Sequence, residues 1–150
     1  MIVGKEEVME VKFYDSVHDS LLKFAVIISK SNGKWVFCKH KERNTYEVPG
    51  GRREGGESIF ETAKRELVEE TGAIDFEIKP ICVYSVTGKT RVNTTGDESF
   101  EMLYFADVKS FEKELQSEIE KVELFDELPC EWTYPLIQPL LIEEYIQRGI

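Results

Sequence analysis

The sequence predicts an α/β (α+β) protein in which a mixed β-sheet lies between helices. Two observations indicate this class. Segments with the hydrophobic pattern of strands stand before and after one strongly helical segment, and a second helical pattern follows near the end of the chain. The chain has 150 residues, the size of one typical domain. It contains no repeat, low-complexity tract or linker, so we expect a single domain over residues 1–150.

The first strand-like segment is residues 21–29, which are almost continuously apolar. This pattern is typical of a strand buried on both faces of a sheet. The pair Asn32-Gly33 follows and favours a tight hairpin turn. Residues 35–40 are therefore expected to form the second strand of a hairpin.

The strongest helical pattern covers residues 58–71, where apolar residues recur with the spacing of an amphipathic helix. Ser58 and Glu61 stand three residues apart and form a capping box at its start. Gly72 is the expected end of the helix, because glycine readily adopts the left-handed conformation found there.

The second half of the chain contains two more strand-like segments, residues 81–86 and 100–108, separated by the polar, turn-rich residues 88–98. Residues 118–125 alternate weakly and predict a further short strand. Apolar residues then recur at helical spacing after Pro135. Pro139 is expected to delay this last helix by a turn, and Gly149 to end it.

The charge of the chain excludes some partners. It carries 19 basic and 29 acidic residues, a net charge of −10, which disfavours long nucleic acid and anionic membranes. It has neither the apolar core of a secretory signal nor a run of the roughly 18 apolar residues that a bilayer span needs. The three cysteines are widely spaced and form no metal-ligand pattern with histidine. We interpret them as buried, reduced thiols, which predicts a cytoplasmic protein.

The helix at residues 58–71 carries three carboxylates on one face: Glu66, Glu69 and Glu70. An acidic helix face is usually only a solvated surface. Here the apolar stripe formed by Ile59, Ala63 and Leu67 lies beside two of the carboxylates, which directs them towards the body of the domain. Packed like charges require a compensating cation, and oxygen ligands suit Mg²⁺ or Mn²⁺.

The residues around this helix form a longer motif with fixed spacing: Gly51, five residues, Glu57, seven residues, Arg65-Glu66-Leu67, one residue, Glu69-Glu70, one residue, Gly72 and Ala73. It resembles the Nudix box of the Nudix hydrolases, and Pro49-Gly50 precedes it as is usual in that family. The departure is Ala73, where the family usually has a larger aliphatic residue. The MutT-like branch and its YtkD-type nucleoside triphosphatases look most similar, through Lys34-Trp35, Gly88-Lys89 and the segment 104–107.

The resemblance implies a Nudix-type α/β/α sandwich and a metal-activated water that attacks phosphorus. Residue by residue, it implies metal ligands at Glu66, Glu69 and Glu70 and at the carbonyl of Gly50. Glu118, or its neighbour Glu120, is a further candidate ligand by resemblance to MutT-like members, and a solvated strand residue is the alternative. Mg²⁺ is the expected cofactor, with Mn²⁺ as a substitute.

Catalytic roles are assigned to four residues: Glu57, Arg65, Glu66 and Glu69. Glu66 is the first candidate for the general base, and Glu69 or a loop carboxylate is the alternative, because the family differs in where its base lies. Arg65 can reach Glu69 one helical turn away, so we expect it, with Glu57, to hold the carboxylates in place. Glu57 can also reach the metal, directly or through water.

Phosphate contacts are expected from residues 39–53, where five basic residues stand against two acidic ones, a local balance of +3. Lys39 is the best single candidate, with Arg52 and Arg53, although a charged hairpin exit explains the same residues equally well. The base should stack on an aromatic ring, and Tyr46 is the candidate chosen from a set that also includes Phe13, Tyr84 and Tyr104.

Three functions are compatible with these observations. The first is a Mg²⁺-dependent pyrophosphohydrolase that cleaves a nucleoside triphosphate, including oxidised guanine nucleotides, to a monophosphate and pyrophosphate. The second is the same chemistry on a nucleotide sugar, a dinucleoside polyphosphate or an RNA 5′ end. The third is a module that senses a nucleotide without cleaving it, but such modules tend to lose the box carboxylates that are present here. The expected partner is a small nucleotide, and the expected assembly is a monomer or homodimer.

Overall fold

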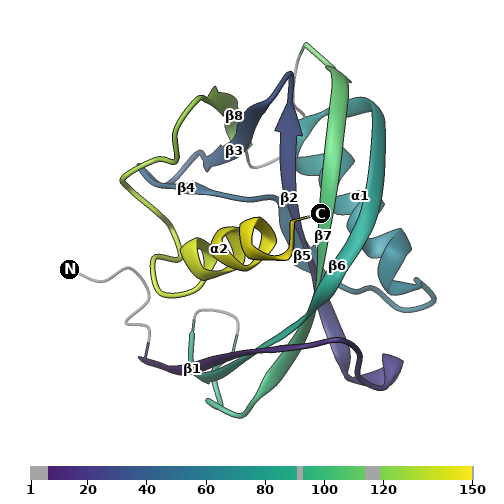
Figure 1. Ribbon diagram of the computed structural model, residues 1–150, viewed down its shortest axis with the longest axis vertical. Coiled ribbons are helices and arrows are strands. Elements are labelled where there is room, and N and C mark those ends of the chain that lie inside the picture. Colours follow the sequence, from purple (N-terminus) through teal and green to yellow (C-terminus); the bar gives the residue numbers. More distant parts are fainter. Residues whose placement is uncertain (1–6, 91–92, 114–118, 150) are drawn as a thin grey trace.

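The computed structural model describes residues 7–90, 93–113 and 119–149 (Figure 1). Its elements in chain order are β1 (Glu7–Tyr14), the 3₁₀ helix η2 (Asp19–Leu21), β2 (Leu22–Ser31), β3 (Lys34–His40), β4 (Tyr46–Glu47), β5 (Gly50–Arg52), α1 (Ile59–Thr71), β6 (Ala73–Lys89), β7 (Ser99–Phe111), β8 (Ile119–Phe125) and α2 (Gln138–Arg148). The predicted fold class, a mixed sheet with helices, is confirmed.

The strands form one sheet in the order β1-β6-β7-β2-β3-β4, with β5 paired to β2 and β8 paired to β3. β2 and β7 run parallel and the other pairs are antiparallel, so the sheet is mixed. The predicted hairpin joins β2 to β3 through Asn32 and Gly33, whose φ angles of 51° and 76° suit a type I′ turn.

The two helices cover opposite faces of the sheet (Figure 1). Side chains alternate along β2, so Ala25 and Ile27 face the core under α1 while Ile28 faces the core under α2. The apolar stripe of α1 fills the first core, and Leu141 and Ile142 of α2 fill the second. This arrangement gives the predicted sandwich.

The helix ends agree with the sequence. Ser58 caps α1, its side chain accepts from the amide of Glu61, and the reciprocal bond completes the capping box. Gly72 ends the helix in the left-handed conformation. α2 starts at Gln138 with Pro139 in its first turn, which confirms the delayed start, and Gly149 follows its last residue.

Three sequence expectations need correction. β1 was not predicted, and β6 starts at Ala73 rather than at residue 81. The first half of β6 escaped prediction because its side chains are mostly exposed and bulges near Asp75 and Pro80 break the alternation. Cys130 is exposed, whereas Cys38 and Cys82 are buried as expected. In the described part of the chain, none of the helices combines the length and the apolar character needed to cross a membrane.

Candidate active site

The glycine-rich loop before α1 is fastened to β2. β5 pairs with β2 so that Gly50 lies opposite Val26 and Gly51 lies opposite Ala25. The amide of Ile27 also donates to the carbonyl of Pro49 at 2.9 Å. These bonds hold the loop in a fixed position relative to the sheet.

Close contacts explain why glycine occupies both positions of this loop. A Cβ at Gly50 would lie 2.7 Å from the carbonyl oxygen of Ala25. A Cβ at Gly51 would overlap the carboxylate of Glu66. The loop backbone therefore lies directly against the acidic face of α1, which is possible only without side chains.

The three carboxylates of α1 differ in their surroundings. Glu66 is buried, with 9% of its surface exposed. Glu70 is partly buried, and its Oε1 accepts a hydrogen bond of 2.7 Å from the amide of Gly50. Glu69 lies at the rim, with 52% of its side chain exposed. The site thus has two carboxylates against the loop and one that is exposed at the rim.

Burial makes two of these carboxylates, Glu66 and Glu70, hard to ionise. It raises the pKa of Glu66 to about 7, and the neighbouring Glu69 adds to the increase. Burial likewise raises the pKa of Glu70 to about 8, and the charges of Glu66 and Glu47 raise it further against the opposing bond from the Gly50 amide. A cation at this position would stabilise the ionised forms.

Arg65 contacts the carboxylates from the solvent side. Its Nε lies 2.6 Å from Oε2 of Glu57, and its Nη1 lies 3.2 Å from Glu66 and 3.4 Å from Glu69. Its Nη2 donates to the carbonyl of Arg52 at 3.0 Å. The bonds from Arg65 lower the pKa of Glu57 to about 2, so Glu57 stays ionised.

Glu57 is itself held by the start of α1. Its Oε1 accepts from the hydroxyl of Thr62 and from the amide of Glu54, each at 2.9 Å. Arg65 and Glu57 therefore connect the loop to the helix, and their expected role in holding the carboxylates stays a prediction.

We expect Arg65→Lys to lower the rate of hydrolysis about 10-fold, because a lysine cannot contact Glu57, Glu66 and Arg52 at once. Arg148→Lys is the matched control, since Arg148 makes a comparable ion pair with Glu144 at the far end of α2. Rates for both variants at saturating Mg²⁺ give the comparison. Equal rates for Arg65→Lys and wild type would show that this bridge is dispensable.

The donor set fits Mg²⁺ in its chemistry, because it consists of carboxylate and carbonyl oxygens. Across residues 7–90, 93–113 and 119–149, no three Asp, Glu, His or Cys side chains yet converge closely enough to hold an ion. The candidate ligand Glu118 lies outside the described residues.

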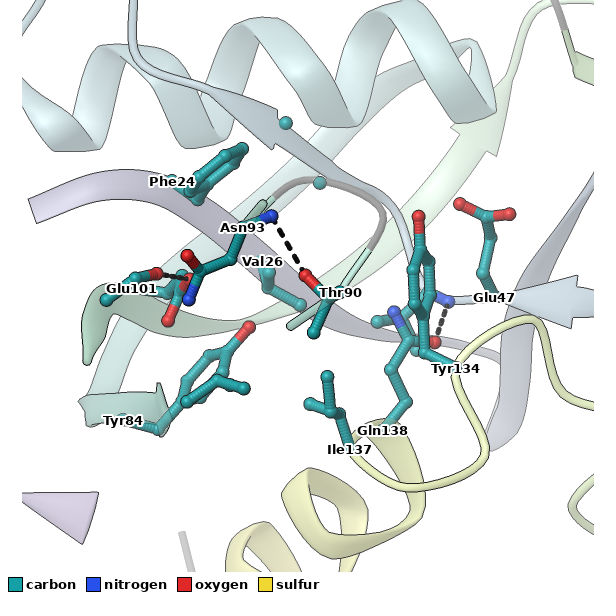
Figure 2. Close-up of a pocket in the computed structure, with 15 residues that line it drawn as sticks. Phe24, Val26, Glu47, Tyr84, Thr90, Asn93, Glu101, Tyr134, Ile137 and Gln138 are labelled. Atoms are coloured by element: carbon teal, nitrogen blue, oxygen red, sulfur yellow. Dashed lines mark hydrogen bonds between the residues drawn. The ribbon is translucent and has the colours of Figure 1, made fainter. Parts of the chain in front are cut away.

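A cavity of about 150 Å³ lies beside the carboxylates, on the sheet face under α2 (Figure 2). A space of this size accommodates an aromatic ring in other proteins. Gly50 and Gly51 belong to its wall, so the cavity and the acidic site share the same loop. Three aromatic residues also line it: Phe24, Tyr84 and Tyr134. Figure 2 shows polar side chains among them, including Glu47 and Glu101.

Two predicted substrate residues lie away from this cavity. Lys39 lies in β3 between Tyr46 and Lys121 of the neighbouring strands, and its Nζ contacts the carbonyl of His40 at 3.5 Å. The ring of Tyr46 packs edge-on against Phe125, and its hydroxyl donates to Glu123 at 3.3 Å. Neither side chain is part of the cavity wall.

The two candidate arginines differ in position. Arg53 donates to Asp19 at 2.9 Å and to the carbonyl of Glu57 at 2.9 Å, so its guanidinium fastens η2 to the loop. The guanidinium of Arg52 instead lies over the ring of Phe24, 4.8 Å from its centroid. Because Phe24 lines the cavity, Arg52 contacts the cavity wall.

The sequence interpretation did not assign several residues of the cavity. Glu47 is mostly buried, is paired with Arg43 at 2.9 Å and faces the same space as the loop glycines. Phe24, Glu101 and Tyr134 come from three different elements or loops. Glu47 could have been found from its position two residues before the Pro49-Gly50 lead-in. The other cavity residues stand in no local motif.

The α/β/α fold and the acidic site against a glycine-rich loop define a class of protein, the hydrolases that act on phosphoanhydride bonds. The family model of the NUDIX domain matches residues 20–135. The chain therefore belongs to the Nudix family, as the spacing of its motif indicated.

Individual proteins agree with this assignment. The chain is 34% identical over 125 residues to YtkD of Bacillus subtilis, provisionally named as an 8-oxo-dGTP diphosphatase, and the match covers 83% of this chain and 75% of YtkD. A crystal structure of the Bacillus subtilis pyrophosphohydrolase BsRppH, in a mutant form, superimposes with a TM-score of 0.74 and 28% identity, covering 93% of this chain and 91% of that one. A NUDIX hydrolase from Nitrosomonas europaea, at 23% identity and a TM-score of 0.67, covers 85% of this chain and 90% of its own and shares the fold.

Proposed function

We propose that the protein is a Mg²⁺-dependent pyrophosphohydrolase that cleaves a nucleoside triphosphate, including oxidised guanine nucleotides, to a monophosphate and pyrophosphate. The observation that carries the proposal is the shared loop: Gly50 and Gly51 line the cavity and also contact the carboxylates of α1. A base in the cavity would place its phosphates along this loop. The names of YtkD and BsRppH support the same chemistry.

The proposed role of each residue follows from its position. Glu66, Glu69, Glu70 and the carbonyl of Gly50 would hold the cation, which supplies charge neutralisation for the phosphates and activation of water. Glu66 is our candidate for the group that accepts the proton of the attacking water, because its carboxylate lies against Gly51, which lines the cavity. Glu69 is the alternative base. Arg65 and Glu57 orient the carboxylates, and Arg52 is placed to meet a phosphate.

Lys39, Arg53 and Tyr46 remain weaker candidates for substrate contacts. Each is engaged with protein groups outside the cavity, so a direct contact would require a rearrangement. The same chemistry on a nucleotide sugar, a dinucleoside polyphosphate or an RNA 5′ end is the second possibility. The net charge of −10 disfavours a long RNA.

A substrate panel tests the proposal. Nucleoside triphosphates, ADP-ribose, a dinucleoside tetraphosphate and a 5′-triphosphorylated oligonucleotide are each incubated with Mg²⁺, and again with EDTA. We expect the highest kcat/KM with a free nucleoside triphosphate and no turnover in EDTA. A higher kcat/KM for another class of substrate would contradict the proposed substrate. Binding without turnover in Mg²⁺ or Mn²⁺ would indicate a nucleotide sensor and not an enzyme.

Metal affinity should depend on pH, because Glu66 and Glu70 must lose their protons before they can bind a cation. Their pKa values of about 7 and 8 place this dependence between about pH 6 and pH 8. We expect the affinity for Mn²⁺ to rise at least about 10-fold per pH unit in this range, with protons released on binding. Calorimetry in two buffers of different ionisation enthalpy counts those protons.

The variant Glu70→Gln provides the control for this titration, since it removes one of the two titrating groups. It should bind Mn²⁺ more weakly and with a shallower dependence on pH. A wild-type affinity that is constant from pH 6 to pH 8 would show that the metal does not bind at these carboxylates.

A further inference from the structure

We propose that Glu101 recognises the base of the substrate, and that its Oε2 accepts hydrogen bonds from the adjacent N1–H and N2–H₂ donors of a guanine-type base. The inference rests on the proposed function, because it assigns the specificity of the same site. Glu101 lies in β7, outside the motif and away from the carboxylates of α1.

The first observation is a hydrogen bond that the protein leaves unmade. Glu101 is 6% exposed, and its Oε1 accepts from the hydroxyl of Ser99 at 2.7 Å. Its Oε2 is fully buried and has no hydrogen-bond partner. In the described part of the chain this is true of one other buried side-chain oxygen, the hydroxyl of Ser29. A buried carboxyl without a partner is costly, so an external partner is the natural explanation.

The second observation is the position of Glu101 between two aromatic rings. In the sheet register it pairs with Phe24 of β2 on one side and with Tyr84 of β6 on the other. Figure 2 shows the three side chains together at one end of the cavity, with the Glu101 carboxyl between the rings. A flat base that stacks on either ring would present its edge to this carboxyl.

The third observation is the number of carboxylate oxygens of Glu101 that are available to a base. Ser99 already occupies Oε1, so a single oxygen is left to read the base. Guanine offers two neighbouring N–H donors that can both approach one carboxylate oxygen, and oxidised guanine shares this edge. Adenine offers an acceptor at the equivalent N1 position and a donor only at its N6 amino group. A lone acceptor therefore favours guanine, in the way that bases outside a duplex are read by their pairing edges.

Burial raises the pKa of Glu101 to about 8, so the carboxyl is largely neutral in the free protein. Two donors from a base would stabilise its ionised form. The base must also displace the side chain of Asn93, which lies beside the carboxyl in Figure 2 and donates to the carbonyl of Asp97 at 2.6 Å. Recognition thus supplies the hydrogen bond that Oε2 lacks and requires the Asn93 side chain to leave its bonds to Asp97, Thr95 and Gly96.

The test measures binding of GMP and AMP by calorimetry in Mg²⁺, since a monophosphate has no phosphoanhydride bond to cleave. We expect the wild-type protein to bind GMP at least about 10-fold more tightly than AMP. Glu101→Met, which keeps the length but removes the acceptor, should weaken GMP binding by at least about 10-fold and change AMP binding less than about 3-fold. Glu101→Gln keeps one acceptor oxygen and should restore part of the affinity for GMP.

Thermal unfolding tests whether the Glu101→Met variant is folded. Replacing a buried carboxyl that lacks a partner by an apolar side chain should raise the Tm by about 2–4 °C. Glu143→Gln, a charge change at an exposed position of α2, is the control and should alter neither binding nor Tm.

The outcomes separate this inference from the proposed function. Unchanged GMP binding in Glu101→Met, or an equal loss of GMP and AMP binding, would overturn the role of Glu101. A wild-type preference for AMP would overturn the assignment to guanine. If GMP binding depends on Glu101 but no triphosphate is cleaved, the inference holds and the proposed function fails. If wild type and Glu101→Met both cleave GTP and ATP, and neither protein distinguishes the two nucleotides in kcat/KM, the proposed function holds and the inference fails.

Discussion

Replacing Glu70 by Gln is expected to reduce Mg²⁺-dependent hydrolysis at least about 100-fold. The Gln side chain can still accept the bond from the Gly50 amide, which holds Glu70 at 2.7 Å, so the loop should stay in place. Its amide group carries no negative charge and presents N–H donors to the cation. The loss should therefore appear in metal affinity and in kcat, and initial rates over a range of Mg²⁺ concentrations measure both.

Glu143→Gln is the matched control for this experiment as well, because it makes the same chemical change on the exposed side of α2. Thermal unfolding of Glu70→Gln without metal should show no loss of stability, since the change removes a buried acid whose ionisation is unfavourable. Glu69→Gln should cause a similar loss of activity. Wild-type turnover in both variants would refute the assignment of these carboxylates.

Gly51→Ala should reduce kcat about 100-fold although it adds one methyl group. That methyl group would overlap the carboxylate of Glu66, which must then leave its position against the loop. Displacing a catalytic group by about 1 Å can cost a factor of about 100. The overlap is with the end of one side chain and not with the backbone, so we expect the protein to remain folded, as circular dichroism would show.

Gly55→Ala is the control for the glycine experiment. Gly55 lies in the same loop, its Cβ would meet nothing within 4 Å, and its φ angle lies outside the left-handed region. It should retain wild-type activity. Equal activities of Gly51→Ala and Gly55→Ala would mean that the position of Glu66 against the loop has no catalytic consequence.

The sequence predicted those parts of the molecule that depend on local chemistry. The capping box at Ser58 and the glycine after Thr71 define α1, and the Asn32-Gly33 turn defines the hairpin. These features need no information about distant strands.

The cavity could not be predicted in this way, because its walls come from segments far apart in the chain. Phe24, Tyr84 and Glu101 meet through the pairing of β2, β7 and β6, and this register is not visible in any local pattern. The same limit applies to the stacking residue, since the sequence does not show that Tyr84 lines the cavity and that the predicted Tyr46 does not. Tyr46 is near the motif in sequence, but β4 directs its ring towards Phe125.

The charge of the chain illustrates the difference between composition and structure. A net charge of −10 disfavours polyanions in general, yet part of it is concentrated at α1, where burial raises the pKa values of Glu66 and Glu70. A bound cation would stabilise the ionised forms of these carboxyl groups. Under the proposed function, the acidity that argues against long nucleic acid would therefore allow a small phosphate ligand to bind through the cation.

Identification of the products shows directly whether the protein cleaves a nucleoside triphosphate to a monophosphate and pyrophosphate. The protein is incubated with GTP and Mg²⁺, and the phosphorus products are followed by ³¹P NMR, with Glu70→Gln as the inactive control. We expect GMP and pyrophosphate as the first products of the wild-type protein. The Glu70→Gln variant should form them at least about 100-fold more slowly. Release of GDP and orthophosphate, or equal turnover by the two proteins, would contradict it.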